Sequence, residues 1–561
     1  MRPLIFGLFA LMTLIQPGRA LAFGDCMQPN YLPYFDIDTV PKPCTEIARF
    51  PVVTAHGRSM LRIIRFTNSA HGDDAIWTAR AEQLAVALGP AIDQIGSARL
   101  PPEISVLLTE DERHIGRLQA HAVTSGMIAY DTGSGPVETE CAVPFYKLPG
   151  GAAVDEFLVA VAHEVFHCAQ YVTWNEAYFG EDPGWWREGS AEYFSHLAVP
   201  GTRLRDDWFA AFDSASLDRP LHRMSYENVV FFLWLATTGG PEAVGAFLDR
   251  MRPGDQLAVL REVLPLAEWR GFVEAYLDGQ IHRPSGGALP RPAAFTGERT
   301  FRAPGELSVS AEDYVIRRWR LTFVADKVFE LATTVQSGAP EVAMRLDGET
   351  GGWAPPPERI STCDGEASHV LYAVSTDSPG AARIAVETDA DTTGGTCCLV
   401  GDWKPTPEAL AGIARFGMAY GAPAVAAAGG AMNCSYQGGD WRLSFYDDGT
   451  AEIVFDGHTS QCTVSGGGGA MSSIGTRGGH SAFTWQVVGD GAARVESLEH
   501  AVTWLIQMKI GPMLQQMPGA EDPVASPAGF AFNCQEDSLI VQGIYGLGTY
   551  EAGHIRVRAA E

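Results

Sequence analysis

The hydrophobic period of the chain changes once, near residue 285, and this change constrains the fold class. Before that point, apolar residues recur at helical spacing in several segments, for example residues 73–88 and 154–172, and a buried-strand pattern lies between them at 102–111. After that point, short segments with a period of two are separated by turn residues. The Pro-, Gly- and Ala-rich stretch HRPSGGALPRPAA, residues 282–294, predicts a linker between the two regions. The sequence therefore predicts an α+β region followed by an all-β region.

Two all-β domains are expected after this linker. Residues 295–392 contain several short strand patterns, which is typical of a β-sandwich. Residues 396–561 begin with the triplet Gly401-Asp402-Trp403 and contain a hairpin pattern around Asp447-Asp448-Gly449. This third segment resembles lipocalin-type barrels, so we expect a small β-barrel there. The Gly-rich stretch 465–480 predicts a flexible loop inside it.

The N-terminus has the pattern of a secretory signal peptide. Arg2 supplies a positive charge, Leu4–Ile15 form an apolar core, and Ala20–Ala22 place small residues before a cleavage site after Ala22. The apolar core is too short to span a bilayer as a mature helix. We therefore expect residues 1–22 to be removed and the mature chain to be secreted or periplasmic, with no membrane attachment. The α+β domain is then expected at residues 23–285.

Charge and cysteine content narrow the function classes further. The formal net charge of −27 argues against nucleic acid or an anionic membrane as the main partner. An apolar fraction of 46% with 19% charged residues is that of a packed globular protein. Ten cysteines in an exported chain suggest up to five disulfides, whose pairing the sequence leaves open. The simplest local pairs are Cys26–Cys44, Cys141–Cys168 and Cys434–Cys462.

The segment AVAHEVFHCAQ, residues 160–170, is the strongest chemical signal in the chain. His163 and His167 lie four residues apart, so on a helix both imidazoles project from one face and can converge on a metal ion. Glu164 follows the first histidine and can reach a metal-bound water without being a ligand. The alternative is a buried helix whose two histidines bond to the backbone.

A third ligand is predicted from PGWWREGSAEYFSH, which begins 16 residues after His167. Glu188 and Glu192 lie one helical turn apart, so one carboxylate can bind the metal while the other accepts a hydrogen bond from a ligand histidine. A solvated helix face is the alternative for these acids. The aromatic and small residues around them, Trp185 and Trp186 among them, favour a buried site instead.

HEVFH followed by WWREGSAEY resembles the gluzincin metallopeptidases, which include aminopeptidase-N-like and bacterial collagenase-like enzymes. The resemblance covers roughly 35 residues and implies a zincin-like catalytic domain with one Zn²⁺ ion. It implies that His163, His167 and Glu188 bind the zinc ion and that Glu164 is the general base. It also implies that Glu192 holds His163 through a hydrogen bond.

The same resemblance implies a mechanism of peptide hydrolysis. Zinc lowers the pKa of its bound water, Glu164 removes a proton, and the resulting hydroxide attacks the peptide carbonyl. The segment SYENVVFFLWL resembles the helix that carries a tyrosine donor in aminopeptidase-like gluzincins, so Tyr226 is the first candidate to stabilise the oxyanion and His222 the second. Ordinary core packing is the alternative for Tyr226. The strand pattern CAVPFYKL, residues 141–148, is a candidate edge strand for pairing with an extended peptide.

The leading hypothesis is therefore an exported zinc endopeptidase that acts on peptide or protein substrates. A G-A-M-E-N stretch of the aminopeptidase kind is absent between residues 100 and 150, which weakens an exopeptidase assignment. One rival is a non-peptidase zinc hydrolase that uses the same helix. The other is a binding or adhesion protein with a structural zincin-like domain, against which the intact Glu164 argues.

Overall fold

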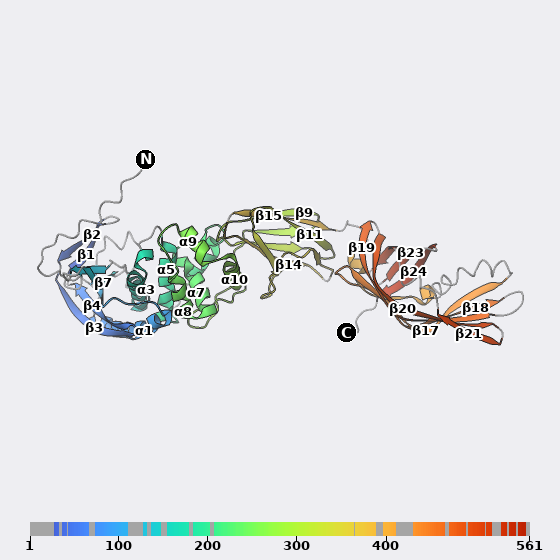
Figure 1. The fold of residues 1–561 in the computed structure, drawn as a ribbon, viewed down its shortest axis with the longest axis horizontal. Coiled ribbons are helices and arrows are strands. Elements are labelled where there is room, and N and C mark those ends of the chain that lie inside the picture. Colours follow the sequence, from blue (N-terminus) through green and yellow to red (C-terminus); the bar gives the residue numbers. More distant parts are fainter. Residues whose placement is uncertain are drawn as a thin grey trace, which may run out of the picture.

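The computed structural model arranges the chain as a series of units along one long axis (Figure 1). A β-sheet region at the N-terminal end is followed by a helical region, a β-sandwich and a long antiparallel sheet. The structure describes residues 27–32, 36–41, 43–66, 73–109, 127–131, 136–146, 154–178, 183–201, 207–363, 365–377, 379–388, 396–410, 430–465, 471–489, 492–510, 512–518, 529–535, 538–545 and 548–556. The predicted signal peptide lies outside these residues.

The first large sheet is five-stranded and mixed, in the order β3-β4-β5-β7-β6. Its strands are β3 (Cys44–Thr54), β4 (Gly57–Phe66), β5 (Glu103–Thr109), β6 (Met127–Asp131) and β7 (Pro136–Tyr146). Strands β4, β5 and β7 run parallel, whereas β3 and β6 are antiparallel to their neighbours. The expected strand at 102–111 is thus confirmed as β5. The expectation that residues 141–148 form an edge strand is wrong, because β7 lies between β5 and β6 and β6 is the edge among the described strands. A separate hairpin joins β1 (Met27–Leu32) to β2 (Asp36–Pro41).

Two long helices pack against this sheet. The first, α1 (Asp74–Ile95), begins at Asp73, whose side chain accepts a hydrogen bond from the backbone N–H of Ala75 and so satisfies one free donor of the first turn. The second, α3 (Val154–Thr173), contacts β5 and β7 and is buried along most of its described length. Both helices were predicted from the helical spacing of their apolar residues, although α1 continues past the predicted end at residue 88.

The helical region after α3 surrounds one large apolar core. Its helices are α4 (Asn175–Tyr178), α5 (Gly184–Ala198), α6 (Asp207–Ala215), η1 (Leu221–Arg223), η2 (Tyr226–Asn228), α7 (Val229–Gly239), α8 (Pro241–Leu248), α9 (Gln256–Val263) and α10 (Leu266–Leu277). The first seven residues of α7 are all buried in this core. Over the part of the chain described, no single helix is long and apolar enough to cross a bilayer, and residues 226–239 and 241–248 meet that criterion only together, across a bend of 118°.

A β-sandwich follows, built from two four-stranded sheets. One sheet contains β12 (Glu341–Leu346), β14 (Ala367–Val374), β10 (Arg317–Phe323) and β8 (Gly297–Phe301). The other contains β13 (Arg359–Ser361), β11 (Val328–Ser337), β15 (Gly380–Thr388) and β9 (Gly305–Ala311). Buried side chains from both sheets form one apolar cluster between them. The predicted sandwich is therefore present.

The segment predicted as a linker is packed rather than free. Its Leu289 is buried, and the backbone N–H groups of Ala293 and Ala294 donate hydrogen bonds to Asp213 of α6. Tyr372 and Trp353 of the sandwich belong to the same apolar core as the helical region. Proline and glycine content marks the end of the helices correctly, but it carries no information about tertiary contacts that hold such a segment in place.

The C-terminal region is a nine-stranded antiparallel sheet that closes almost completely into a barrel. Its strands are β16 (Gly401–Pro405), β17 (Ala431–Phe445), β18 (Thr450–Ser465), β19 (Met471–Gly489), β20 (Ala492–Ile510), β21 (Met513–Pro518), β22 (Gly529–Gln535), β23 (Ser538–Tyr545) and β24 (Gly548–Arg556). Pairing of β16 with β24 and of β19 with β20 brings the ends of the sheet together. The predicted hairpin at residues 447–449 joins β17 to β18, and Gly449 there has a φ of 84°.

One expectation for this region is wrong. Of the stretch 465–480 predicted as a flexible loop, residues 466–470 lie outside the described residues, whereas residues 471–480 form the first half of β19. Strands β18 and β20 flank this segment and pair with it on both sides, and their backbone hydrogen bonds compensate for the weak strand propensity of its glycines. The coarse fold class, a mixed α/β structure with several sheets and a barrel-like C-terminal sheet, is confirmed. The zincin arrangement of the first domain stays a prediction.

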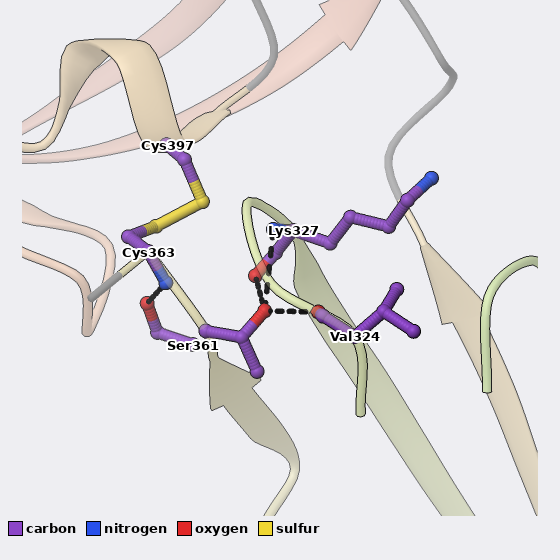
Figure 2. The surroundings of a disulfide bond; sticks show 6 residues. Val324, Lys327, Ser361, Cys363 and Cys397 are labelled. Carbon is purple, nitrogen blue, oxygen red and sulfur yellow. Dashed lines mark hydrogen bonds between the residues drawn. A yellow bond between two sulfur atoms is a disulfide. The ribbon is translucent and has the colours of Figure 1, made fainter. Parts of the chain in front are cut away.

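Disulfides fix several of these elements. Cys141–Cys168 and Cys434–Cys462 form as predicted, and the first joins β7 to α3 one residue after His167. The predicted pair Cys26–Cys44 includes a residue outside the described part of the chain. A third disulfide, Cys363–Cys397, joins the end of β13 to the short helix α11 (Thr396–Leu399) and so links the sandwich to the start of the barrel (Figure 2). The three disulfides for which the structure describes both cysteines are compatible with an extracellular protein.

Candidate metal centre

Helix α3 positions two histidines of the candidate centre. His163 and His167 lie one turn apart, and 2% and 5% of their surfaces are exposed. Their Nε2 atoms are 3.1 Å apart. Apolar residues of α3 pack against the sheet and against α1 and α5, so the histidine face of the helix is held inside the protein. The local pattern of the sequence therefore produces the convergence that i and i+4 spacing predicts.

Helix α5 places a third possible metal-binding atom next to the two histidine nitrogens. One oxygen of Glu188, Oε2, lies 3.3 Å from Nε2 of His163 and 3.2 Å from Nε2 of His167. The three residues together form a group that could hold a metal ion. The structure thus brings together the three residues that the sequence predicts as ligands.

Glu192, one turn further along α5, contacts the opposite side of His163. Its Oε2 lies 3.1 Å from Nδ1 of His163, and its side chain is completely buried. Its other oxygen, Oε1, lies 3.7 Å from Nε2 of His196 on the same helix. A carboxylate at Nδ1 favours the tautomer in which that nitrogen carries the proton, which leaves Nε2 of His163 free to bind a metal.

The electrostatics of the cluster favour a cation at its centre. Burial acts to lower the pKa of His163, but hydrogen bonds to Glu188 and Glu192 outweigh it and raise that pKa to about 9. Burial acts to raise the pKa of Glu188, but His167 and His163 hold it well below the usual range of a carboxyl group. Both shifts follow from the attraction between the histidines and the carboxylates, which favours positive charge on the imidazoles and negative charge on Glu188.

Close packing of α5 against η2 and α7 fixes the position of Glu188. A Cβ atom on Gly189 would lie 2.8 Å from Cβ of Asn228 and 3.0 Å from the ring of Phe232. Asn228 also donates hydrogen bonds to the backbone carbonyls of Trp185 and Leu221. The glycine that follows the third ligand is therefore required by packing between helices.

The residues predicted to act on the substrate lie around this cluster. Glu164 is buried, with 9% of its surface exposed, and its charge contributes to the raised pKa of His163. The ring of Tyr226 stacks on the imidazole of His163, at 5.5 Å between centroids and 23° between planes. His222 lies in η1, next to α5. The roles of Tyr226 and His222 as oxyanion donors stay predictions.

Three residues near the centre were missed by sequence reasoning. Gln170 accepts a hydrogen bond from His167, with 2.7 Å between Oε1 and Nδ1. Arg187 donates from Nε to Oε1 of Glu188 at 3.3 Å and lies over the ring of Tyr178 at 5.1 Å. Burial raises the pKa of Tyr178 to about 12, and the charges of Glu188 and Glu164 add to this shift. The spacing of Gln170, three residues after His167 on one helix, is a signal that could have indicated its contact.

Comparisons of the chain with protein-family models, with curated proteins and with solved structures find no match. The resemblance to gluzincins is therefore carried by the two short motifs, and the metal-binding potential of the centre by the geometry of His163, His167 and Glu188.

Proposed function

We propose that this protein is a zinc-dependent metallopeptidase whose centre consists of His163, His167 and Glu188. The convergence of their three donor atoms from two helices is the observation that carries the proposal. Two nitrogens and one carboxylate oxygen form a ligand set typical of catalytic zinc, in which three protein ligands leave a fourth position open.

The distances support this ion. Ligand atoms about 2.0–2.1 Å from a tetrahedral zinc ion lie roughly 3.3 Å from one another. The three donor atoms are separated by 3.1, 3.2 and 3.3 Å, so an ion fits between them with little movement of the side chains. The buried negative charge of Glu192 behind His163 adds to the attraction for a divalent cation.

The residues around the centre support hydrolysis. A bound zinc ion supplies Lewis-acid polarisation of the scissile carbonyl and makes water a stronger nucleophile. In the proposed reaction, the Glu164 carboxylate accepts a proton from the attacking water and delivers it to the leaving amine. A neutral tyrosine hydroxyl, with Tyr226 as the first candidate, donates a hydrogen bond to the carbonyl oxygen as negative charge develops on it.

The edge of the five-stranded sheet supports an extended peptide as the proposed substrate. Strand β6 is an edge of the five-stranded sheet over the described residues, and β7 beside it contacts the ligand helix α3. A free strand edge can pair with the backbone of an extended chain. The strand edge therefore favours a peptide or protein as the substrate. The alternatives are a zinc hydrolase that acts on another class of substrate and a binding protein whose metal centre is structural.

The test combines metal analysis with peptide cleavage. Wild-type protein is expected to bind one zinc ion per chain and to cleave peptides from an unbiased library. Glu164→Gln is expected to keep the zinc ion and to lose cleavage, whereas Glu188→Gln is expected to lose both. Glu82→Gln, the same change at an exposed position of α1, is the control and is expected to behave as wild type. Equal cleavage by wild type and Glu164→Gln would contradict the proposed mechanism.

A further inference from the structure

Gln170 joins one histidine of the centre to the helix that carries the third ligand. Its side chain is completely buried on α3, one turn after His167. The side-chain oxygen Oε1 lies 2.7 Å from Nδ1 of His167. The side-chain nitrogen Nε2 donates to the backbone carbonyl of Arg187 and to the hydroxyl of Ser190, both at 2.8 Å and both on α5. One amide therefore contacts both sides of the interface between α3 and α5.

The partner on α5 determines which way this amide faces. The carbonyl oxygen of Arg187 can only accept a hydrogen bond, so the NH₂ end of Gln170 must point toward it. The oxygen of Gln170 then faces His167, and this oxygen can only accept. The nitrogen Nδ1 of His167 must therefore carry the hydrogen, which leaves the lone pair of Nε2 directed toward His163 and Glu188.

We infer that Gln170 is a positioning residue that holds His167 in its Nδ1–H tautomer and ties the imidazole to the helix of Glu188. The inference rests on the proposed metal centre, because the tautomer matters only if Nε2 binds an ion. A backbone carbonyl at position 187 thus sets the protonation pattern of a side chain on the neighbouring helix, with Gln170 as the connection.

The two histidines are held by groups of different charge. Glu192, which contacts Nδ1 of His163, is a carboxylate, whereas Gln170 is neutral. A carboxylate at position 170 would still accept from Nδ1 of His167, but its second oxygen would face the carbonyl oxygen of Arg187. The contact with α5 therefore requires a neutral side chain at position 170. The substitution Gln170→Glu keeps the contact with His167 and removes the one with Arg187, so it separates the effects of the two contacts.

The test measures zinc affinity by competition with a chromogenic chelator. Gln170→Met keeps the length of the side chain but removes both contacts, and it is expected to weaken zinc binding about 10- to 100-fold. Gln170→Glu keeps the acceptor for His167 and is expected to bind zinc more tightly than Gln170→Met. Gln256→Met is the matched control, because Gln256 is also buried and contacts α5 through the indole N–H of Trp185 but touches no ligand histidine. This control is expected to keep wild-type zinc affinity.

The second measurement is the tautomer of His167, read from the nitrogen chemical shifts of the histidine ring in metal-free protein. Wild type and Gln170→Glu are expected to show a protonated Nδ1, and Gln170→Met is expected to show a mixture of both tautomers. Wild-type zinc affinity in Gln170→Met, or equal loss in Gln170→Met and Gln170→Glu, would overturn the inference, as would a wild-type His167 ring that carries hydrogen on Nε2 and none on Nδ1.

These outcomes are separate from those that test the proposed function. A protein that binds zinc but cleaves no peptide contradicts the peptidase proposal and leaves the role of Gln170 to be decided by affinity and tautomer. A wild-type protein that binds no zinc overturns both proposals.

Discussion

The aromatic ring of Tyr226 lies flat against the imidazole of His163, with 5.5 Å between the two centroids. Trp208 stacks on Tyr226 in turn, at 5.1 Å and 13°. His163 is thus held from two directions, by the carboxylate of Glu192 at Nδ1 and by an aromatic stack along its ring face. The tyrosine that the sequence singles out for its hydroxyl group also has a packing role through its ring.

The two roles of Tyr226 can be separated by substitution. Tyr226→Phe keeps the ring, so we expect zinc content to stay at the wild-type level while kcat falls about a hundredfold to a thousandfold if the hydroxyl stabilises the oxyanion. Tyr226→Leu removes the stack and is expected to weaken zinc binding as well. Metal analysis and steady-state cleavage of one peptide measure both effects. Loss of zinc from the Phe variant would assign the hydroxyl a structural role.

Tyr178 is expected to stay protonated well above the usual pH of tyrosine ionisation. Burial is the largest cause that raises its pKa to about 12, and the carboxylates of Glu188 and Glu164 act in the same direction. Because the folded pKa exceeds the unfolded value of about 10, the contribution to stability is fully present below pH 10 and is lost as pH rises through 12. Phenolate absorbance of wild type minus that of Tyr178→Phe should show no ionisation near pH 10. A difference signal centred near pH 10 would contradict the burial of this hydroxyl.

Gly189 is expected to tolerate no side chain. Gly189→Ala places a methyl group against Asn228 and Phe232, so we expect a loss of about 1–3 kcal/mol of unfolding free energy and weaker zinc binding as α5 moves away. Gly184→Ala, at the start of the same helix, is the control, since no atom lies within 4 Å of the added Cβ. Chemical denaturation and chelator competition measure the two quantities. Equal behaviour of the two alanine variants would show that α5 adjusts without cost.

The sandwich is expected to be required for folding of the domain before it. Tyr372 donates a hydrogen bond to Glu274 of α10, Trp353 donates to Asp278, and the buried Arg318 pairs with Asp213 of α6. A chain that ends at residue 285 would expose this face, and each uncovered aromatic side chain of α10 would lose about 1.5–3 kcal/mol of burial.

We therefore expect the chain ending at residue 285 to be insoluble and one ending at residue 388, with Cys363→Ser to remove the thiol left without Cys397, to fold and bind zinc. Soluble yield, circular dichroism and zinc content check this prediction. A soluble, zinc-binding chain that ends at residue 285 would show that the sandwich is an independent module.

The convergence of the candidate metal-binding side chains could be predicted in part, because it depends on local geometry. His163 and His167 share a helix, and the helical period of residues 154–172 places them on one face whatever surrounds the helix. The spacing of Glu188 and Glu192 works in the same way on α5. The pairing of the two helices does not follow from this spacing, and the sequence suggested it only through the resemblance of the two short motifs to those of gluzincins.

The errors concern contacts between segments that are distant in sequence. Residues 471–480 look like a loop because of their glycines, yet pairing with β18 and β20 makes them a strand. Residues 141–148 look like a candidate edge strand, yet β6 covers that edge of β7. Local propensity is a weak preference, and hydrogen bonds with neighbouring strands override it when the fold brings those strands together.

The sequence by itself determined that His163 and His167 share one helix face, that Glu188 and Glu192 lie one turn apart, and that an α+β region precedes an all-β region. It left the pairing of the cysteines open. Only the tertiary structure decided that Gln170 faces the carbonyl of Arg187, that Gly189 must lack a side chain, and that the sandwich shares a core with the helices. The physical reason is the separation along the chain between the residues that interact. Helical periodicity repeats every 3.6 residues and can be read along the chain, whereas the contact between α3 and α5 that orients His167 exists only where two packed helices meet.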